Sequence, residues 1–457
     1  MITPAEPLAD KTYRRGDASY AELTSGWNTR IRHRPRCVVV ATDPDDVTEA
    51  VRYAATRRMP IRVQATGHGA LAGADDGMLI HTGHWTGVTV DGQRRTAEVR
   101  GGTRWQEVLD ATQPYGLAGL SGSASFVGAI GYALGGGAGW LARRYGLCSD
   151  TIEAAEVVTA DGRRRWVDAD HEPDLWWALR GGFGNVGAVT ALRLRLVPVP
   201  EVYAGARSWP VAAAPEILAA YREWVAGVPP EVGSAITFVQ YPDVPQVPEP
   251  VRGRTVVQVR ACSCGPLEEA PALLAPLTGL GGALLDTFRV MPYREIGTVT
   301  QDPERPMPRT GHSTAVTELS DPVLGALAGL AQPGAAFMSL EARHVAGVTA
   351  ARGEPAGPAH CDAGFLLFTM AVTPDEASRR AAAGFGSRLL RATGAWQTGH
   401  NLGTFVLAPP DPAGAPEQVR SSYAPGDLAR LAAIKAAYDP QGLFGGDRRI
   451  EAASSNG

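Results

Sequence analysis

Alternating apolar and polar positions divide the first two hundred residues into short elements. Residues 37–63, CVVVATDPDDVTEAVRYAATRRMPIRV, predict a strand, a helix and a second strand, because a β-branched run is followed by a turn and then by apolar positions at helical spacing. Hairpins are predicted at Asp91-Gly92 and Asp161-Gly162, since each turn dipeptide separates two strand-like runs. Residues 104–116 predict a short helix and residues 189–200 a strand. Small units of helices and hairpins therefore fill this region.

The pattern changes near Pro198. Beyond it, amphipathic helices such as residues 214–225 alternate with strands such as residues 253–262, and two later segments (336–345 and 363–372) predict neighbouring antiparallel strands. Residues 427–450 predict a helix followed by an extended tail. Because 457 residues exceed what one compact core usually holds, we expect two domains of mixed α+β type.

Composition and charge exclude several classes of protein. An apolar fraction of 44% and a charged fraction of 20% are typical of a globular chain, and a net charge of -4 without a long block of like charge argues against a nucleic-acid partner. The five cysteines are scattered, so we expect neither a disulfide framework nor a metal site. The N-terminus lacks the apolar core of a signal peptide, which favours a cytoplasmic location.

The uncharged stretch at residues 116–142 is long enough to span a bilayer. It contains three consecutive glycines and several serines, which a lipid-facing helix rarely combines. We therefore predict a buried loop and helix here, and no membrane partner.

One histidine, His68, stands between two glycines in the stretch QATGHGALAG (residues 64–73). It could be a turn residue, a metal ligand or a cofactor ligand. A dinucleotide-binding fingerprint is disfavoured, because the third glycine comes one position late and turn-rich sequence follows where the crossover helix must begin. Two more glycine-rich stretches, residues 121–140 and 176–190, can bring backbone amides close to an anionic or flat ligand. Three such loops favour a large cofactor.

Several stretches match the sequence motifs of one protein family, in the order in which they occur in that family. They are Trp27-Asn28 followed by residues 34–54, residues 61–69, residues 121–152, residues 174–190 and the closing segment 434–444. In these stretches the chain resembles the FAD-linked oxidases of the vanillyl-alcohol oxidase superfamily, specifically the berberine-bridge-enzyme-like group. The resemblance covers most of residues 24–450 and is loosest in the middle.

The resemblance implies an α+β fold: a two-lobed PCMH-type FAD-binding domain, an inserted substrate domain whose antiparallel sheet is backed by helices, and a C-terminal segment that returns to the FAD domain. The expected boundaries are 1–30 for an N-terminal extension, 31–202 for the FAD-binding domain, 203–395 for the substrate domain, 396–451 for the C-terminal segment and 452–457 for a disordered tail.

In this family the histidine that matches His68 is joined to the 8α-methyl carbon of the flavin, so the resemblance implies FAD bound covalently through His68. A neutral imidazole nitrogen supplies the nucleophile for such a bond. The matched loops give these expected cofactor-binding residues: Gln64, Ala65, Thr66, Gly67, His68, Gly69, Ser121, Gly122, Ser125, Gly128, Gly131 and Ile152.

The chain departs from the family pattern at two places. Many relatives carry a cysteine in the second loop that binds the flavin a second time; this chain has Ala124 there and Cys148 beyond the loop, so we expect a single covalent link. Relatives often carry a catalytic tyrosine in a Tyr-x-Asn pattern, whereas residues 396–406 read WQTGHNLGTFV. The resemblance therefore does not assign the role of the usual tyrosine base to a residue of this chain.

Candidate bases are His400, His344 and Tyr423. On the predicted strand 336–345, Glu341 and Arg343 point one way and His344 the other, and either face could look toward the flavin. Glu341 with Arg343 is either a substrate-binding clamp or a structural ion pair.

We expect an oxidase that transfers hydride from an alcohol, sugar or amine carbon of a secondary metabolite to flavin N5, with reoxidation by O₂. The expected partners are a small-molecule substrate and O₂, and the expected assembly is a monomer or homodimer. Because the usual tyrosine is missing, a cyclase or isomerase that uses FAD without net redox change remains the alternative.

Overall fold

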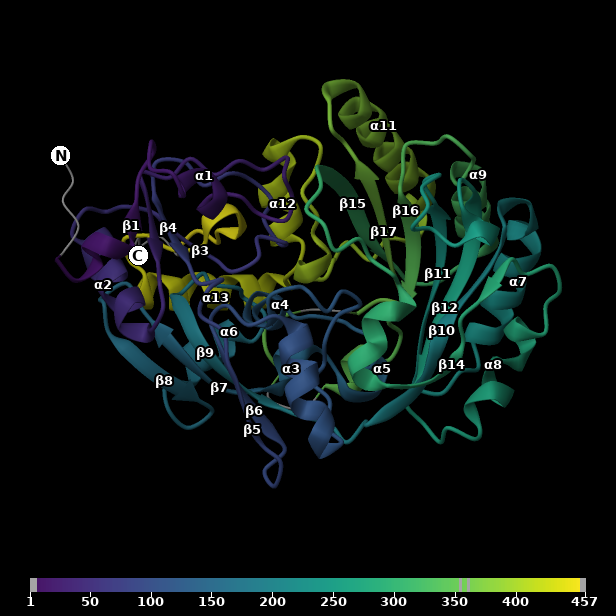
Figure 1. Ribbon diagram of the computed structural model, residues 1–457, viewed down its shortest axis with the longest axis horizontal. Helices are drawn as coiled ribbons and strands as arrows, with labels where there is room; N and C mark the ends of the chain where they lie inside the picture. The colour runs from purple at the N-terminus through teal and green to yellow at the C-terminus, as the bar shows by residue number, and fades with distance from the viewer. Residues whose placement is uncertain (1–5, 353–355, 360–361, 453–457) are drawn as a thin grey trace.

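The computed structural model describes residues 6–352, 356–359 and 362–452, and two small sheets form its N-terminal part (Figure 1). The four-stranded sheet has the order β1-β2-β4-β3, with β2, β4 and β3 parallel, and the five-stranded sheet has the antiparallel order β5-β6-β9-β7-β8. Their strands are β1 (Thr12–Tyr13), β2 (Cys37–Val40), β3 (Ile61–Gln64), β4 (Met78–His81), β5 (Val88–Asp91), β6 (Thr96–Arg100), β7 (Ile152–Val158), β8 (Arg164–Asp168) and β9 (Ala188–Arg195).

Local signals in the sequence account for these units. The helix α2 (Pro44–Ala55) begins where the Asp43 carboxylate accepts hydrogen bonds from two backbone amides of the first turn. The predicted hairpins are confirmed as β5–β6 and β7–β8, and the predicted short helix as α3 (Trp105–Thr112). The uncharged stretch 116–142 folds into loops around α4 (Ala129–Leu134) and the start of α5 (Ala142–Tyr145). In the described part of the chain, no helix has the length and apolar character needed to cross a bilayer.

An eight-stranded sheet forms the other half of the molecule (Figure 1). Its order is β13-β10-β12-β11-β16-β17-β15, with β14 paired to β10, and all its pairs are antiparallel. The predicted pairing of two late strands is confirmed as β16–β17. The strands are β10 (Glu201–Pro210), β11 (Val232–Gln240), β12 (Thr255–Ser263), β13 (Leu285–Asp286), β14 (Arg289–Pro292), β15 (Arg309–Val316), β16 (Ser339–His344) and β17 (Phe365–Val372).

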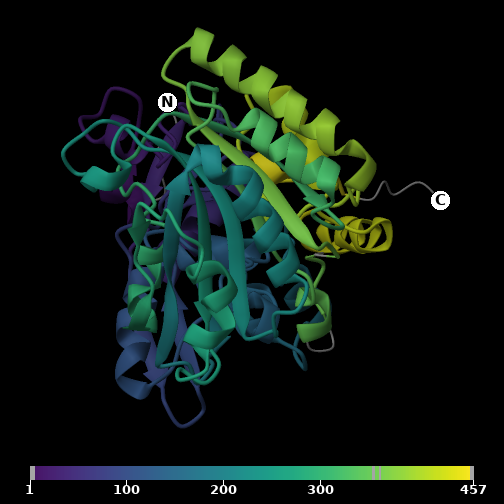
Figure 2. The same ribbon diagram turned by 90° about the vertical axis from the view of Figure 1, so that its right-hand side faces the viewer.

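Strand alternation gives this sheet two different faces. One face is apolar, with Ile236, Leu340 and Leu367 in a core that also contains residues of the covering helices. Figures 1 and 2 show these helices along the outer side of the sheet. They are α7 (Ala214–Val225), α8 (Ala270–Thr278), α9 (Asp321–Leu330) and α11 (Glu376–Thr393). The opposite face, which carries Glu341 and Arg343, is turned toward the small sheets.

The C-terminal segment crosses back to the small sheets (Figure 1). Residues of α12 (Ala415–Arg420) and α13 (Pro425–Tyr438) join the core that contains the five-stranded sheet. The buried ammonium of Lys435 pairs with Asp439 at 2.7 Å and donates hydrogen bonds to the carbonyls of Asn185 and Phe444. The chain's last part is therefore fixed to residues near β9. The predicted disordered tail lies almost wholly outside the described residues, at 453–457.

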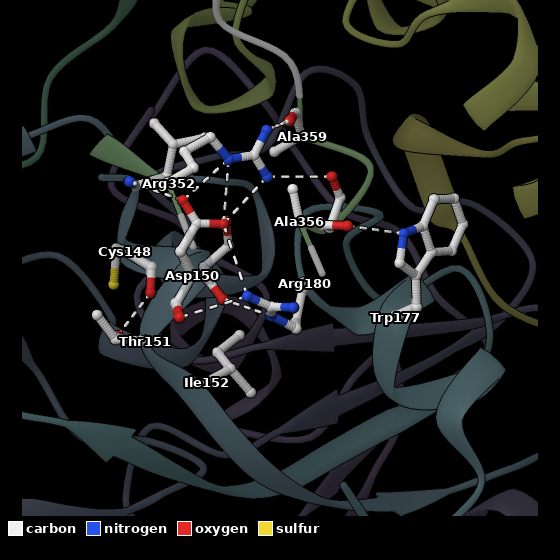
Figure 3. A network of polar contacts seen from close by, with 12 residues as sticks. Cys148, Asp150, Thr151, Ile152, Trp177, Arg180, Arg352, Ala356 and Ala359 are labelled. Carbon is white, nitrogen blue, oxygen red and sulfur yellow. Dashed lines mark hydrogen bonds and ion pairs between the residues drawn. The ribbon is translucent and has the colours of Figure 1, made fainter. Parts of the chain in front are cut away.

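A buried carboxylate connects the two halves behind the second glycine-rich stretch (Figure 3). Asp150 is paired with Arg352 at 3.0 Å and with Arg180 at 3.7 Å, and both guanidinium groups are buried. Arg352 also donates hydrogen bonds to the carbonyls of Gly357 and Ala359. Ala359 in turn contacts the glycine-rich turns at residues 136 and 181. Asp150 thus holds a segment of the inserted half against the loops of the first half.

We predict that Asp150→Asn lowers the free energy of unfolding by about 3–5 kcal/mol, because two buried guanidinium groups lose their shared counter-charge. Denaturant titration measures the change. Asp45→Asn is the matched control, since its exposed pair with Arg164 should contribute less than about 1 kcal/mol. Equal, small losses for the two variants would contradict this role of Asp150.

Candidate active site

A cavity of about 780 Å³ lies between the small sheets and the polar face of the eight-stranded sheet. One side is formed by residues within 61–71, 122–138, 183–189 and 444–448. The other side is formed by residues of β11, β12, β15, β16 and β17. The three glycine-rich stretches of the sequence therefore meet at one cavity.

The first stretch approaches the N-terminal segment so closely that glycine is required. Gly67 has a φ of +71°, and a Cβ there would lie 2.6 Å from the Cα of Gly26. The loop places His68 against two aromatic rings that also stack on each other: the imidazole stacks on Trp27 with 4.7 Å between ring centroids, and Phe126 lies at 5.1 Å. Gln64, Ala65, Thr66, Gly67, His68 and Gly69 all line the cavity.

The imidazole of His68 is held neutral. Burial, together with the positive charges of Arg309 and Arg104, lowers its pKa from 6.5 to about 2. Its Nδ1 lies 3.0 Å from Thr66 Oγ1, which also accepts a hydrogen bond from the Gly128 amide. Its Nε2 is buried and has no hydrogen-bond partner among the described residues. When Nδ1 carries the hydrogen and donates it to Thr66, a lone pair is left on Nε2.

The second stretch divides into residues that line the cavity and residues that lie behind it. Gly122, Gly128 and Gly131 line it, as does Ala124. Three other expected cofactor-binding residues do not. The Ser121 hydroxyl is 3.4 Å from the Tyr293 hydroxyl, the Ser125 carbonyl accepts a hydrogen bond from the Gln106 amide, and the Ile152 carbonyl accepts one from the Trp176 indole. Their contacts are those of residues that support the loop.

A buried ion-pair group forms part of the sheet side. The Glu341 carboxylate is 2.9 Å from Arg260 and 2.7 Å from Arg343, and it accepts a hydrogen bond from the Thr237 hydroxyl. All three charged side chains line the cavity, so this is the strand face that looks inward. Sequence reasoning missed Arg260, although its alternation with Gln258 in the otherwise apolar strand β12 was a usable signal.

The three expected bases do not meet at the cavity, and none belongs to its described lining. His344 points to the opposite face of β16, where it stacks on Phe365 at 5.0 Å; burial lowers its pKa to about 3. Tyr423 is buried in the core, donates a hydrogen bond to the Gly181 carbonyl, and has a pKa raised by burial. His400 lies in the connection before Gly403, where its backbone bonds to Thr398. This placement argues against all three as direct proton acceptors.

Two lining residues were absent from the sequence-based candidates. Tyr132 of α4 has a hydroxyl that is buried without a partner in the described chain, and burial raises its pKa well above the ordinary value. Arg309 of β15 stacks its guanidinium over the Trp27 ring, with 4.4 Å from Cζ to the centroid. No local signal marks Arg309, because its position depends on the pairing of β15 with β17.

The residues present fit a flavin dinucleotide. Glycines allow the backbone to approach a flat group, and His68, whose buried Nε2 has no partner among the described residues, lines the same cavity. A neutral imidazole is the form that can bond to a flavin methyl carbon. The cavity volume is also within the range of cofactor sites.

Comparison with known proteins agrees with this geometry. Residues 35–168 match the family described as FAD binding domain. The chain is 27% identical over 483 residues to (R)-6-hydroxynicotine oxidase of Paenarthrobacter nicotinovorans, covering 100% of this chain and 99% of that protein. The chain is therefore an FAD-dependent oxidoreductase, with an FAD-binding domain at residues 35–168.

Solved structures of low identity share the fold of this oxidoreductase. BBE-like 1 of Physcomitrella patens superposes with a TM-score of 0.83 at 20% identity and covers 98% of both chains. The glucooligosaccharide oxidase of Acremonium strictum, whose crystal structure reveals a novel flavinylation, superposes with a TM-score of 0.82 at 18% identity, covering 97% of this chain and 96% of that one. The expected α+β fold of PCMH-type oxidases is therefore confirmed.

We predict that His344 affects the stability of the folded protein at acid pH and does not act in the candidate active site. Its pKa is depressed in the folded state, so its stabilising contribution is present above pH 6.5 and is lost as the pH falls toward 3. Between pH 7 and pH 5, the free energy of unfolding of the wild type should fall by about 2 kcal/mol more than that of His344→Phe, which keeps a ring stacked on Phe365. Urea unfolding at both pH values measures this difference. An unchanged pH dependence would contradict it.

Proposed function

We propose that the oxidoreductase holds FAD covalently through His68 and oxidises an alcohol, sugar or amine carbon of a small secondary metabolite, with O₂ as the electron acceptor. The observation that carries this proposal is the neutral, buried imidazole with an unpartnered Nε2 in a glycine-lined cavity. The bond would join an imidazole nitrogen to the 8α-methyl carbon: each partner would lose one hydrogen as a proton, and the two electrons would pass to the flavin ring and from it to O₂.

We expect a single covalent link between the flavin and the chain. Ala124 lines the cavity where many relatives carry a cysteine, and a methyl group cannot form the second bond. Cys148 is fully buried outside the described lining, and burial raises its pKa, so it remains a packed thiol. The four described cysteines are unpaired, which is consistent with the cytoplasmic location expected from the sequence.

Bound FAD would supply a hydride acceptor at N5. The chain's own residues would supply the enclosure and the proton transfer. Trp27 and Phe126 flank the attachment point and exclude water from it. Among the described residues, Glu341 is the carboxylate that the sheet turns into the cavity, so we assign it the contact with the substrate's O–H or N–H proton. Arg260 and Arg343 orient this carboxylate from both sides.

The names of the relatives support the reaction type without fixing the substrate. One relative is an oxidase of 6-hydroxynicotine and another an oxidase of glucooligosaccharides, so amine and sugar oxidation both occur on this fold. For this chain we propose only the reaction type of these relatives, which is the removal of hydride from a carbon that bears oxygen or nitrogen.

We predict that acid-precipitated wild-type protein stays yellow, whereas His68→Ala releases all its flavin into the supernatant. The variant should still bind FAD in the native state, because the glycine loops are unchanged. Absorbance of pellet and supernatant measures the partition. Thr66→Val is a graded control: it removes the hydroxyl beside Nδ1 and should slow flavin attachment without preventing it. Flavin that is fully extractable from wild type would contradict the attachment.

We predict that Glu341→Gln slows anaerobic flavin reduction by about a hundredfold or more with flavin content retained, because proton removal assists hydride transfer. A panel of alcohols, amines and sugars is first screened for peroxide release, and the active compound is then used in stopped flow. His344→Phe is the matched control and should reduce at the wild-type rate.

Equal rates for Glu341→Gln and wild type would remove Glu341 from this role. Wild-type protein that consumes a substrate without bleaching its flavin would instead favour the cyclase or isomerase alternative.

A further inference from the structure

The cavity carries an excess of positive charge. Asp447 is paired with Arg62 at 3.0 Å, and Glu341 is shared by Arg260 and Arg343. The described lining holds five arginines and three carboxylates, an excess of two positive charges: Arg62, Arg260, Arg309, Arg343, Arg448, Asp302, Glu341 and Asp447.

Arg309 is held firmly in this lining. The side chain of Asn28 accepts a hydrogen bond from the Arg309 amide at 3.1 Å and donates one to its carbonyl at 3.0 Å. The guanidinium lies on the Trp27 ring and donates one hydrogen bond to the His68 carbonyl at 3.1 Å. Its other terminal nitrogen is 3.2 Å from the sulfur of Met370, which is a weak acceptor. The group is therefore pre-oriented beside the attachment point.

No carboxylate of the described chain lies within ion-pair distance of Arg309. Asp302, the nearest acidic influence, instead accepts a hydrogen bond from the Thr300 hydroxyl. A guanidinium carries five N–H groups, and the two contacts above leave three of them without an acceptor among the described residues. A half-buried cation with unused donors in a cavity is costly unless an anion binds to it.

Arg309 belongs to the sheet side of the cavity, and its guanidinium reaches across to the first glycine-rich loop. Arg448, the arginine beside the first glycine loop, donates a hydrogen bond to the Gly69 carbonyl and comes from the segment that closes the FAD-binding half. Arg309 comes from β15, in the sheet that forms the opposite side of the cavity. An anion in the cavity between the sheet and this loop can therefore contact the unused N–H groups of Arg309.

We propose that Arg309 binds a carboxylate of the substrate, and that the oxidoreductase acts on acidic molecules in preference to protonated amines. The planar guanidinium suits a two-point contact with a carboxylate, and Trp27 fixes its orientation. The same charge repels a protonated amine. This inference rests on the proposed function only in treating the cavity as the substrate site.

Isothermal titration calorimetry of the purified holoprotein at pH 7 tests the inference with three probes that share one ring: benzoate, benzyl alcohol and benzylamine. We expect benzoate to bind at least about tenfold more tightly than the other two, the scale of one charge-assisted contact. Arg309→Met should abolish this preference without changing the affinity for benzyl alcohol, and Arg309→Lys should keep part of it. Arg305→Met removes the same charge from an exposed position nearby, outside the described lining, and should change nothing.

Three results would overturn the inference: benzylamine binding as tightly as benzoate, no measurable benzoate binding, or an unchanged benzoate affinity in Arg309→Met. A fall in flavin content per chain in Arg309→Met would also overturn it, because the guanidinium would then serve the cofactor. Failure of the His68 attachment is seen separately, as flavin released on denaturation, and leaves the benzoate comparison valid.

Discussion

The imidazole of His68 lies against Trp27 and Phe126, where a proton on the ring would be poorly solvated and close to two arginines. Most features of the site follow from this burial. The glycine at position 67 lets the loop lie against the N-terminal segment, and Thr66 fixes one ring nitrogen. The other nitrogen, which is buried without a partner in the described chain, then keeps its electron pair. A cofactor methyl group placed there would meet a neutral nucleophile at physiological pH.

The two sides of the cavity perform different tasks. Glycine-rich loops on the side of the small sheets offer backbone and little side chain, as a large planar cofactor requires. The eight-stranded sheet offers a polar face on which Arg260 and Arg343 share Glu341, whereas Arg309 has no carboxylate partner among the described residues. Helices pack on the other face of this sheet, and the Asp150 network ties the inserted half to the loops (Figure 3). Rigid walls on both sides are what an enzyme needs to hold a reacting carbon against a cofactor atom.

Local patterns were enough to predict the hairpins, α2 and the β16–β17 pair, because each depends on residues near in sequence. The face on which His344 lies could not be predicted, since alternation shows that His344 and Glu341 are on opposite sides without showing which side is covered by helices. The same limit applies to Arg309, which reaches Trp27 across 282 positions of the chain through strand pairing. Ser121, Ser125 and Ile152 were expected at the cofactor from matched loops, yet their contacts lie behind the lining.

The central claim is that one ring nitrogen of His68 bonds to the flavin, and the intact mass of the purified, denatured protein tests it most directly. The account predicts a single species with the mass of the chain plus one FAD less two hydrogens, and a tryptic flavopeptide that contains His68. A species with the mass of the unmodified chain, or a flavin mass on a peptide without His68, would contradict it.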